Sequence, residues 1–239
     1  ALFARRPGAV VGRKVAGHVV VPPGATCAEG IVGMVRGVVE LALQIEAGLL
    51  PPPERVVVPL GSGGTLAGLW VGFALLGLPV HLHGVSVVER LWTTRGRVRR
   101  LARRTVDRLR AAGVEGPLQW PPLTIDRAQL GRGYGVPTQR GLAAVARFKT
   151  LGIPIEAVYS GKAMAALSAG AAGGERVLFW LTPRASDPLP TAPDWRERLP
   201  GPLRRRLATG RGPTRRRLLI GAGLVGGLAY LRSCVGYPP

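Results

Sequence analysis

Residues 61–65 have the composition of a phosphate-binding loop. The loop consists of Gly61, Ser62, Gly63, Gly64 and Thr65. It follows an apolar run at 55–60 and precedes an apolar segment of helical length at 66–76. Glycines let the chain turn sharply and approach a ligand closely, and the first amides of the following helix lack partners inside that helix. Those amides, the helix dipole and the hydroxyls of Ser62 and Thr65 would together bind a phosphate group.

This pattern does not identify the phosphate compound. No lysine follows the last glycine, so the loop is not a nucleotide-binding P-loop. Leu66 stands where a dinucleotide-binding G-x-G-x-x-G loop has its last glycine. Short glycine-rich turns also connect strands to helices without binding a ligand. The residues alone therefore leave two interpretations, a phosphate site and a plain strand-to-helix connection.

The composition is typical of a globular protein with one or two domains. The chain has 239 residues, of which 46% are hydrophobic, and a formal net charge of +20. Such a charge suggests nucleic acid or an acidic membrane as a partner. However, the chain has no basic stripe interleaved with aromatic residues and no known nucleic-acid motif. A bias toward residues with GC-rich codons, including 35 glycines and 22 prolines, gives the charge another origin. We expect no nucleic-acid partner.

Cysteine and histidine usage excludes the common metal and disulfide frameworks. The two cysteines, Cys27 and Cys234, lie far apart in the sequence, and the three histidines form no ligand cluster with them. We therefore expect a reduced, cytoplasmic enzyme domain without a structural metal.

Strand and helix patterns alternate along the chain and predict an open, mostly parallel α/β sheet flanked by helices. Strands are expected at 17–21, 55–60, 79–88 and 176–181. Helices are expected at 28–47, 66–76, 93–112, from after residue 138 to about 150, and at 162–169. Residues 113–123 form a connector rich in proline and glycine. Because such sheets bind ligands at the carboxyl ends of their strands, we expect the functional motifs to meet at that edge.

Thr26 precedes the first of these helices. Glu29 follows three residues later, so the pair predicts a capping box at the helix N-terminus. A direct contact between Thr26 and a ligand is the alternative interpretation.

Five short motifs occur in order between residues 22 and 180. They are P-P-G-A-T at 22–26, G-S-G-G-T-x-A-G at 61–68, G-x-G-Y-G-V-P-T at 131–138, V-Y-S-G-K-A-M at 158–164 and V-L-F-W at 177–180. In this order they resemble the pyridoxal-phosphate enzymes of the D-cysteine desulfhydrase and 1-aminocyclopropane-1-carboxylate deaminase family, which have the tryptophan-synthase-β fold type. The resemblance implies a large pyridoxal-phosphate lobe, of which this sequence is expected to be the C-terminal, N-terminally truncated part.

The resemblance also implies roles for single residues. Residues 61–65 would hold the phosphate of pyridoxal 5'-phosphate, and Ser160 would face the pyridine nitrogen. Tyr159 would lie against the cofactor ring, and Tyr134 would lie near the substrate to handle a proton or orient its carboxylate. The structural alternative is that both tyrosines are buried with their hydroxyls bonded to the backbone. Similar deaminases carry a carboxylate at the position of Ser160, so the serine favours the desulfhydrase branch.

The implied function is that of a pyridoxal-phosphate-dependent lyase or deaminase acting on a small amino acid. The favoured reaction is β-elimination from D-cysteine, which gives a 2-oxo acid, ammonia and hydrogen sulfide. The alternatives are ring opening as in 1-aminocyclopropane-1-carboxylate deaminase, and a non-catalytic protein that binds ligands or a membrane. The complete protein is expected to be a homodimer.

The lysine that forms the Schiff base in this family is expected to be missing from this sequence. In the family it lies in an N-terminal segment, in a motif that none of Lys14, Lys149 and Lys162 matches. Lys162 is expected to be structural. The chain is therefore expected to be a catalytically incomplete fragment.

The end of the chain departs from the family pattern. The expected organisation is a pyridoxal-phosphate lobe at 1–190, a linker rich in arginine and proline at 191–217, and a short apolar tail at 218–239. The apolar run at 218–231 is shorter than the roughly 20 residues that cross a bilayer. The favoured interpretation of this run is a fused or aberrant tail. The alternatives are a membrane anchor and a disordered tail, and membrane contact is not expected.

Overall fold

The computed structural model describes residues 22–170 and 173–182, and five separate positions beyond them. Those positions are Asp194, Glu197, Arg198, Gly201 and Arg204. Residues 22–182 lie in a compact unit that spans Val21–Arg184. The strand expected at 17–21 and the tail at 218–239 lie outside the described residues, as does most of the linker at 191–217.

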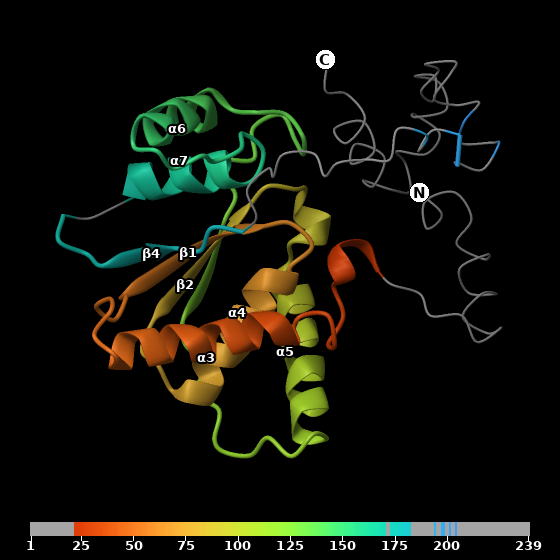
Figure 1. The fold of residues 1–239 in the computed structure, drawn as a ribbon, viewed down its shortest axis with the longest axis vertical. Coiled ribbons are helices and arrows are strands. Elements are labelled where there is room, and N and C mark those ends of the chain that lie inside the picture. The colour runs from red at the N-terminus through yellow and green to blue at the C-terminus, as the bar shows by residue number, and fades with distance from the viewer. Residues whose placement is uncertain are drawn as a thin grey trace. The chain divides into compact units, whose positions relative to one another are not determined.

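A four-stranded parallel sheet forms the centre of this unit (Figure 1). The strands are β1 (Arg55–Leu60), β2 (His81–Ser86), β3 (Leu123–Asp126) and β4 (Val177–Phe179). Their order across the sheet is β3-β2-β1-β4. Arg55 at the start of β1 pairs with His81 on one side and with Val177 on the other. The predicted parallel α/β architecture is confirmed.

Strand β3 differs from the expectation of a connector at 113–123 with no strand after it. The strand has only four residues and follows Pro121 and Pro122. A proline cannot donate to a ladder but can accept, and the carbonyl of Pro122 receives the amide of Leu82 at 2.9 Å. β3 lies at the edge of the sheet, where such a short segment is tolerated, and is too short for alternating hydrophobicity to reveal it.

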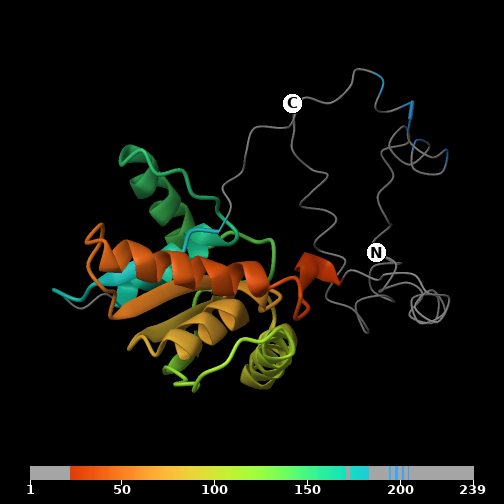
Figure 2. The ribbon, with the colours of Figure 1, turned by 60° about the horizontal axis from the view of Figure 1, so that its bottom comes forward.

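The helices cover the two faces of the sheet unequally (Figures 1 and 2). One face carries α3 (Val32–Glu46), α4 (Gly64–Leu76) and α5 (Arg95–Arg110), and the other carries α6 (Gln139–Thr150) and α7 (Ser160–Gly170). Two short 3-10 helices, η1 (Pro23–Ala25) and η2 (Arg90–Trp92), lie in the connections. Right-handed crossovers explain this distribution. The chain moves across the sheet from β1 through β2 to β3, which places the connecting helices on one face, and it then moves in the opposite direction to β4, which places the next helices on the other face.

Helix α4 is the centre of the hydrophobic core. Residues 66–74 are all buried, so the helix has no solvent-facing side over most of its length. It packs against α3, α5 and the strands β1 and β2. The helix predicted at 66–76 is confirmed and begins two residues earlier, at Gly64.

Three glycines on α4 let α3 approach closely. Gly64, Gly68 and Gly72 are spaced by four residues and therefore share one face of the helix. A Cβ atom on Gly68 would lie 2.5 Å from the Cβ of Met34, and one on Gly72 would lie 2.7 Å from the Cβ of Val38. The axis of α4 can lie this close to α3 only because those positions carry no side chain.

The predicted capping box at Thr26 and Glu29 is wrong. Helix α3 begins at Val32, its N-cap is Ile31, and the N-cap makes no side-chain hydrogen bond. Residues 27–31 first form turns, in which Gly30 lies so close to the carbonyl of Ala25 that no Cβ would fit. Thr26 therefore lies too far from the helix to cap it, and its hydroxyl contacts another residue.

His83 is expected to make the stability of the fold depend on pH. Its Nε2 lies 3.7 Å from a carboxylate oxygen of Asp126. Burial lowers the pKa of His83 below its usual value of 6.5 and outweighs the opposing effect of Asp126, and Arg55 lowers it further. Below pH 6.5 the unfolded histidine therefore binds a proton that the folded one does not. The free energy of unfolding should fall as the pH falls through this range, by about 1.4 kcal/mol per unit of pKa difference.

Urea unfolding at pH 7.5 and pH 5.5 would measure this effect, with His83→Gln as the comparison. The variant should lose part of the pH dependence. An equal loss of stability on acidification in both proteins would contradict the assignment to His83.

Candidate functional site

The loop after β1 lies where the strand order reverses. The chain runs outward from β1 through β2 to β3, and then returns to place β4 on the opposite side of β1. In open parallel sheets the crevice for a ligand lies outside the carboxyl ends of the strands at such a point. The sheet therefore places residues 61–63 at the position that most often binds a ligand in this architecture, as expected from the sequence.

The loop has the geometry of an anion-binding turn. β1 ends at Leu60, Gly63 adopts a left-handed conformation with a φ of 95°, and α4 begins at Gly64. The carbonyl of Gly63 accepts the first bond of the helix, from Ala67 at 3.0 Å. Within residues 22–170 and 173–182, the amides of residues 62–66 have no backbone acceptor. These amides at the positive end of the α4 dipole are available to a phosphate group.

The hydroxyl groups of Thr26 and Ser62 meet beside this loop. Thr26 donates a hydrogen bond to the Oγ of Ser62 at 2.6 Å. A Cβ on Gly24 would lie 3.0 Å from the same oxygen, so the segment before α3 folds closely over the loop. Because Ser62 accepts from Thr26, its own hydroxyl proton is free to point toward an anion. The contact places Thr26 beside the loop and not at a helix cap. The alternative interpretation, a direct contact between Thr26 and a ligand, stays a prediction.

Tyr159 lies directly against the glycine loop. A Cβ on Gly61 would lie 3.0 Å from the Cε1 atom of the Tyr159 ring, so a side chain at position 61 would displace the ring. The Tyr159 hydroxyl donates to the hydroxyl of Tyr134 at 3.1 Å. The two rings meet edge to face, with their centroids 5.9 Å apart. The structure thus brings Gly61, Tyr159 and Tyr134 into one continuous group, although they belong to three separate sequence motifs.

Ser160 lies at the N-terminus of α7 and is buried. Its Oγ accepts the amide of Glu156 at 2.9 Å and donates to the carbonyl oxygen of the same residue at 3.2 Å. The Glu156 carboxylate in turn accepts the amides of Val158 and Ser160, each at 2.7 Å. Glu156 therefore caps α7 and holds Ser160 in place. Glu156 is not among the residues expected at the site from the sequence, although a carboxylate just before a helix is a recognisable capping signal.

The Lys162 side chain is completely buried. Its ammonium group donates to the carbonyls of Leu130 and Gly133, at 2.9 and 3.0 Å. Burial lowers the pKa of Lys162, and the carboxylates of Glu89 and Glu156 oppose that shift. Both hydrogen bonds go to the loop that carries Tyr134, so Lys162 has a structural role here.

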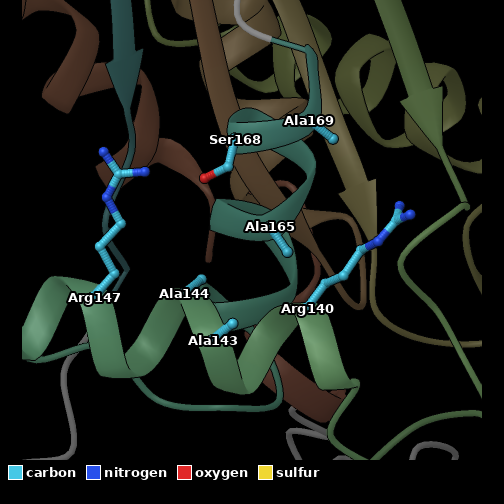
Figure 3. A pocket seen from close by; sticks show the side chains of 7 residues that line it. All are labelled: Arg140, Ala143, Ala144, Arg147, Ala165, Ser168 and Ala169. Atoms are coloured by element: carbon cyan, nitrogen blue, oxygen red, sulfur yellow. The ribbon is translucent and has the colours of Figure 1, made fainter.

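A separate cavity of about 290 Å³ lies between α6 and α7. Figure 3 shows alanine side chains from both helices along its floor, with Arg140 and Arg147 at its two ends. Neither the glycine loop nor the two tyrosines line it. The cavity is therefore not part of the site around residues 61–65.

The described part of the chain offers no metal centre. Among those residues, no group of three or more histidine, cysteine, aspartate or glutamate side chains could hold a metal ion. Nor does any helix found there have both the length and the apolar character needed to cross a membrane.

Comparison with known proteins identifies the family. The model of the family described as pyridoxal-phosphate dependent enzymes matches residues 11–182. The chain belongs to this family. Two D-cysteine desulfhydrases, from Salmonella paratyphi B and Salmonella newport, are each 35% identical to it over 154 residues. Each alignment covers 63% of this chain and 44% of the relative, so the chain spans less than half the length of these D-cysteine desulfhydrases.

A solved structure supports the same assignment. The crystal structure of an ACC deaminase homologue superimposes with a TM-score of 0.57 at 28% sequence identity, covering 74% of this chain and 53% of that protein. The resemblance inferred from five motifs is thereby confirmed, as is the α/β fold class. Pyridoxal 5'-phosphate is the cofactor of the family.

Proposed function

We propose that the chain binds pyridoxal 5'-phosphate with the phosphate at residues 61–65, and that it serves a lyase or deaminase reaction on a small amino acid. The favoured reaction is desulfhydration of D-cysteine by β-elimination, which gives a 2-oxo acid, ammonia and hydrogen sulfide. The observation that carries this proposal is the contact between Gly61 and Tyr159. It joins the phosphate loop to the tyrosine expected beside the cofactor ring.

The residues present fit the phosphate end of the cofactor. The amides of residues 62–66, which lack backbone acceptors in the described part of the chain, supply donors, and the left-handed Gly63 turns the chain toward the helix N-terminus. Ser62 and Thr65 supply hydroxyl groups at the same place. Charge-assisted hydrogen bonds of this kind are about twice as strong as neutral ones.

Three side chains would act on the ring and the substrate. When bound, pyridoxal 5'-phosphate supplies an electron sink that stabilises negative charge at the substrate Cα. Tyr159 would pack beside the ring, and Ser160 would place a neutral side chain at the ring nitrogen. To donate to that nitrogen, the Ser160 hydroxyl would exchange its present hydrogen bond to Glu156. The Tyr134 hydroxyl, which accepts from Tyr159, would orient the substrate carboxylate or hold a proton near it.

The D-cysteine reaction is favoured over ring opening because position 160 carries a neutral side chain and because the desulfhydrases are 35% identical to this chain. The ACC deaminase homologue supports the alternative at 28% identity. Catalytic incompleteness of the chain stays a prediction, as do a homodimer, a cytoplasmic location and the absence of nucleic-acid and membrane partners.

Cofactor binding can be tested without interference from lysine chemistry. Pyridoxamine 5'-phosphate has no aldehyde, so it cannot react with a surface lysine. It should quench tryptophan fluorescence on titration, and pyridoxamine, which lacks the phosphate, should bind at least about tenfold more weakly because it cannot use the donors of the loop. Equal affinities for the two compounds would contradict the assignment of residues 61–65.

The reaction itself is tested by sulfide release. Protein loaded with pyridoxal 5'-phosphate is incubated with D-cysteine and, as the matched control, with L-cysteine. Release from D-cysteine alone would support the favoured reaction. Ammonia from 1-aminocyclopropane-1-carboxylate without sulfide from D-cysteine would support the alternative. Cofactor binding without either product would support a non-catalytic chain.

A further inference from the structure

The loop that carries Tyr134 has little conformational preference of its own. Gly131, Gly133 and Gly135 have positive φ angles of 63°, 127° and 76°. Glycine adopts such conformations easily but loses more conformational freedom than other residues when it is fixed. A side chain that must be placed accurately from this loop therefore needs anchors elsewhere in the protein.

Two charged side chains form hydrogen bonds to one peptide unit of this loop. The carbonyl of Gly133 accepts from the Lys162 ammonium at 3.0 Å, and the amide of Tyr134 donates to Oε1 of Glu89 at 3.2 Å. That carbonyl and that amide belong to the same peptide bond. In a trans peptide they point in opposite directions, so the cation and the carboxylate hold the plane from its two sides.

The absence of a side chain at Gly133 is part of this arrangement. A Cβ there would lie 3.1 Å from the same Glu89 oxygen that receives the Tyr134 amide. Lys162 also holds Leu130, at 2.9 Å, so the start of the loop is fixed by the same ammonium group. Lys162 comes from α7 and Glu89 from the connection after β2, so the anchors belong to two separate parts of the sheet framework.

We propose that Lys162 and Glu89 are positioning residues that orient the Gly133–Tyr134 peptide and thereby hold the Tyr134 hydroxyl against Tyr159. Fixing the peptide plane fixes where the Tyr134 side chain leaves the backbone, and its hydroxyl lies 3.1 Å from that of Tyr159. The relevance of this arrangement to catalysis rests on the proposed function. The arrangement itself does not, because its hydrogen bonds join residues of this chain to one another.

Glu89 offers the sharper test because it is exposed, and its replacement leaves the core intact. Glu89→Gln keeps an oxygen that can accept the Tyr134 amide, whereas Glu89→Leu does not. With 3-fluorotyrosine in place of the four tyrosines, fluorine NMR reports each ring separately, and Tyr134→Phe and Tyr159→Phe assign the two resonances. In Glu89→Leu the Tyr159 resonance should move toward its position in Tyr134→Phe, and in Glu89→Gln it should stay near the wild-type position.

Amide exchange and ligand affinity complete the test. The Tyr134 amide should exchange about tenfold faster in Glu89→Leu, because it loses its acceptor. Lys162→Met should also move the Tyr159 resonance, and Lys162→Arg, which keeps a buried cation and its donors, should restore part of the wild-type signal. The affinity for pyridoxamine 5'-phosphate should stay within about threefold in Glu89→Leu, since the amides at residues 61–65 are unchanged.

A Tyr159 resonance that stays at its wild-type position in Glu89→Leu would overturn the proposal, and so would equal shifts in the leucine and glutamine variants. Failure of the unmodified protein to bind pyridoxamine 5'-phosphate would instead overturn the proposed function. In that case the fluorine resonances would still report whether Glu89 and Lys162 orient the Gly133–Tyr134 peptide. Failure of the positioning proposal and failure of the proposed function are therefore distinguishable.

Discussion

Replacing Gly63 by alanine is expected to weaken the binding of pyridoxamine 5'-phosphate at least about tenfold. Gly63 has a φ of 95°, which an L-residue with a side chain adopts only at a penalty of about 1–2 kcal/mol. Space is not the obstacle, because the new Cβ would lie 3.6 Å from Val98, an ordinary contact distance. The strain would instead rotate the backbone at the start of α4, and the amides would no longer converge on the phosphate. Quenching of tryptophan fluorescence measures the change.

Gly113 provides the matched control for this variant. Its φ of 86° is similar, a Cβ there meets nothing within 4 Å, and it lies in the turn after α5. Gly113→Ala should lower the free energy of unfolding by a similar amount of about 1–2 kcal/mol and leave the ligand affinity unchanged. If both variants lost affinity equally, the loss would reflect general destabilisation and not the loop at 61–65.

A large loss of stability is expected for Gly68→Ala. The added Cβ would lie 2.5 Å from the Cβ of Met34 and 2.9 Å from the carbonyl oxygen of Ile31. One of these neighbours is backbone, so the overlap is relieved only if α3 moves away from α4. Overpacking of this kind lowers the free energy of unfolding by about 1–3 kcal/mol, and the buried backbone contact places Gly68 at the upper end of that range. Urea unfolding followed by tryptophan fluorescence measures the loss.

A glycine-to-alanine substitution on α3 should change the free energy of unfolding in the opposite direction. Gly33 lies on α3, and a Cβ there meets nothing within 4 Å. Gly33→Ala should therefore raise the free energy of unfolding, by up to about 1 kcal/mol, because alanine favours the helix more than glycine does. A loss of stability at both positions would show that the close packing of Gly68 is not the cause.

The sequence predicted the parts of the fold in which local pattern and burial agree. The run at 55–60, the glycine turn and the apolar helix that follows were assigned correctly because each is long and uniformly apolar or rich in glycine. The strand at 79–88 was also found, although the structure limits it to His81–Ser86. The meeting of the motifs at the carboxyl edge followed from the parallel topology alone.

The rest depended on contacts between residues far apart in the chain. No local pattern indicates that Thr26 would donate to Ser62, and the sequence rule for helix caps assigned that hydroxyl to α3 instead. Glu89 and Lys162 bind the Gly133–Tyr134 peptide across sequence separations of 45 and 29 residues, which no local pattern reveals. Strand β3 was missed because four residues after two prolines carry too little pattern to be recognised.

The pairing of β1 with β4 is the last strand pairing of the described sheet that can form during synthesis. Arg55 pairs with Val177, and the contact between Gly61 and Tyr159 lies between segments nearly as far apart. The ribosome synthesises β1, β2 and β3 long before β4. Until β4 emerges, the edge of β1 that faces away from β2 has no partner strand in the nascent chain. An unpaired strand edge binds other strands readily, which makes this stage the one most exposed to aggregation. Ribosome-bound chains halted before residue 177 should therefore recruit chaperones more strongly than chains released after residue 182.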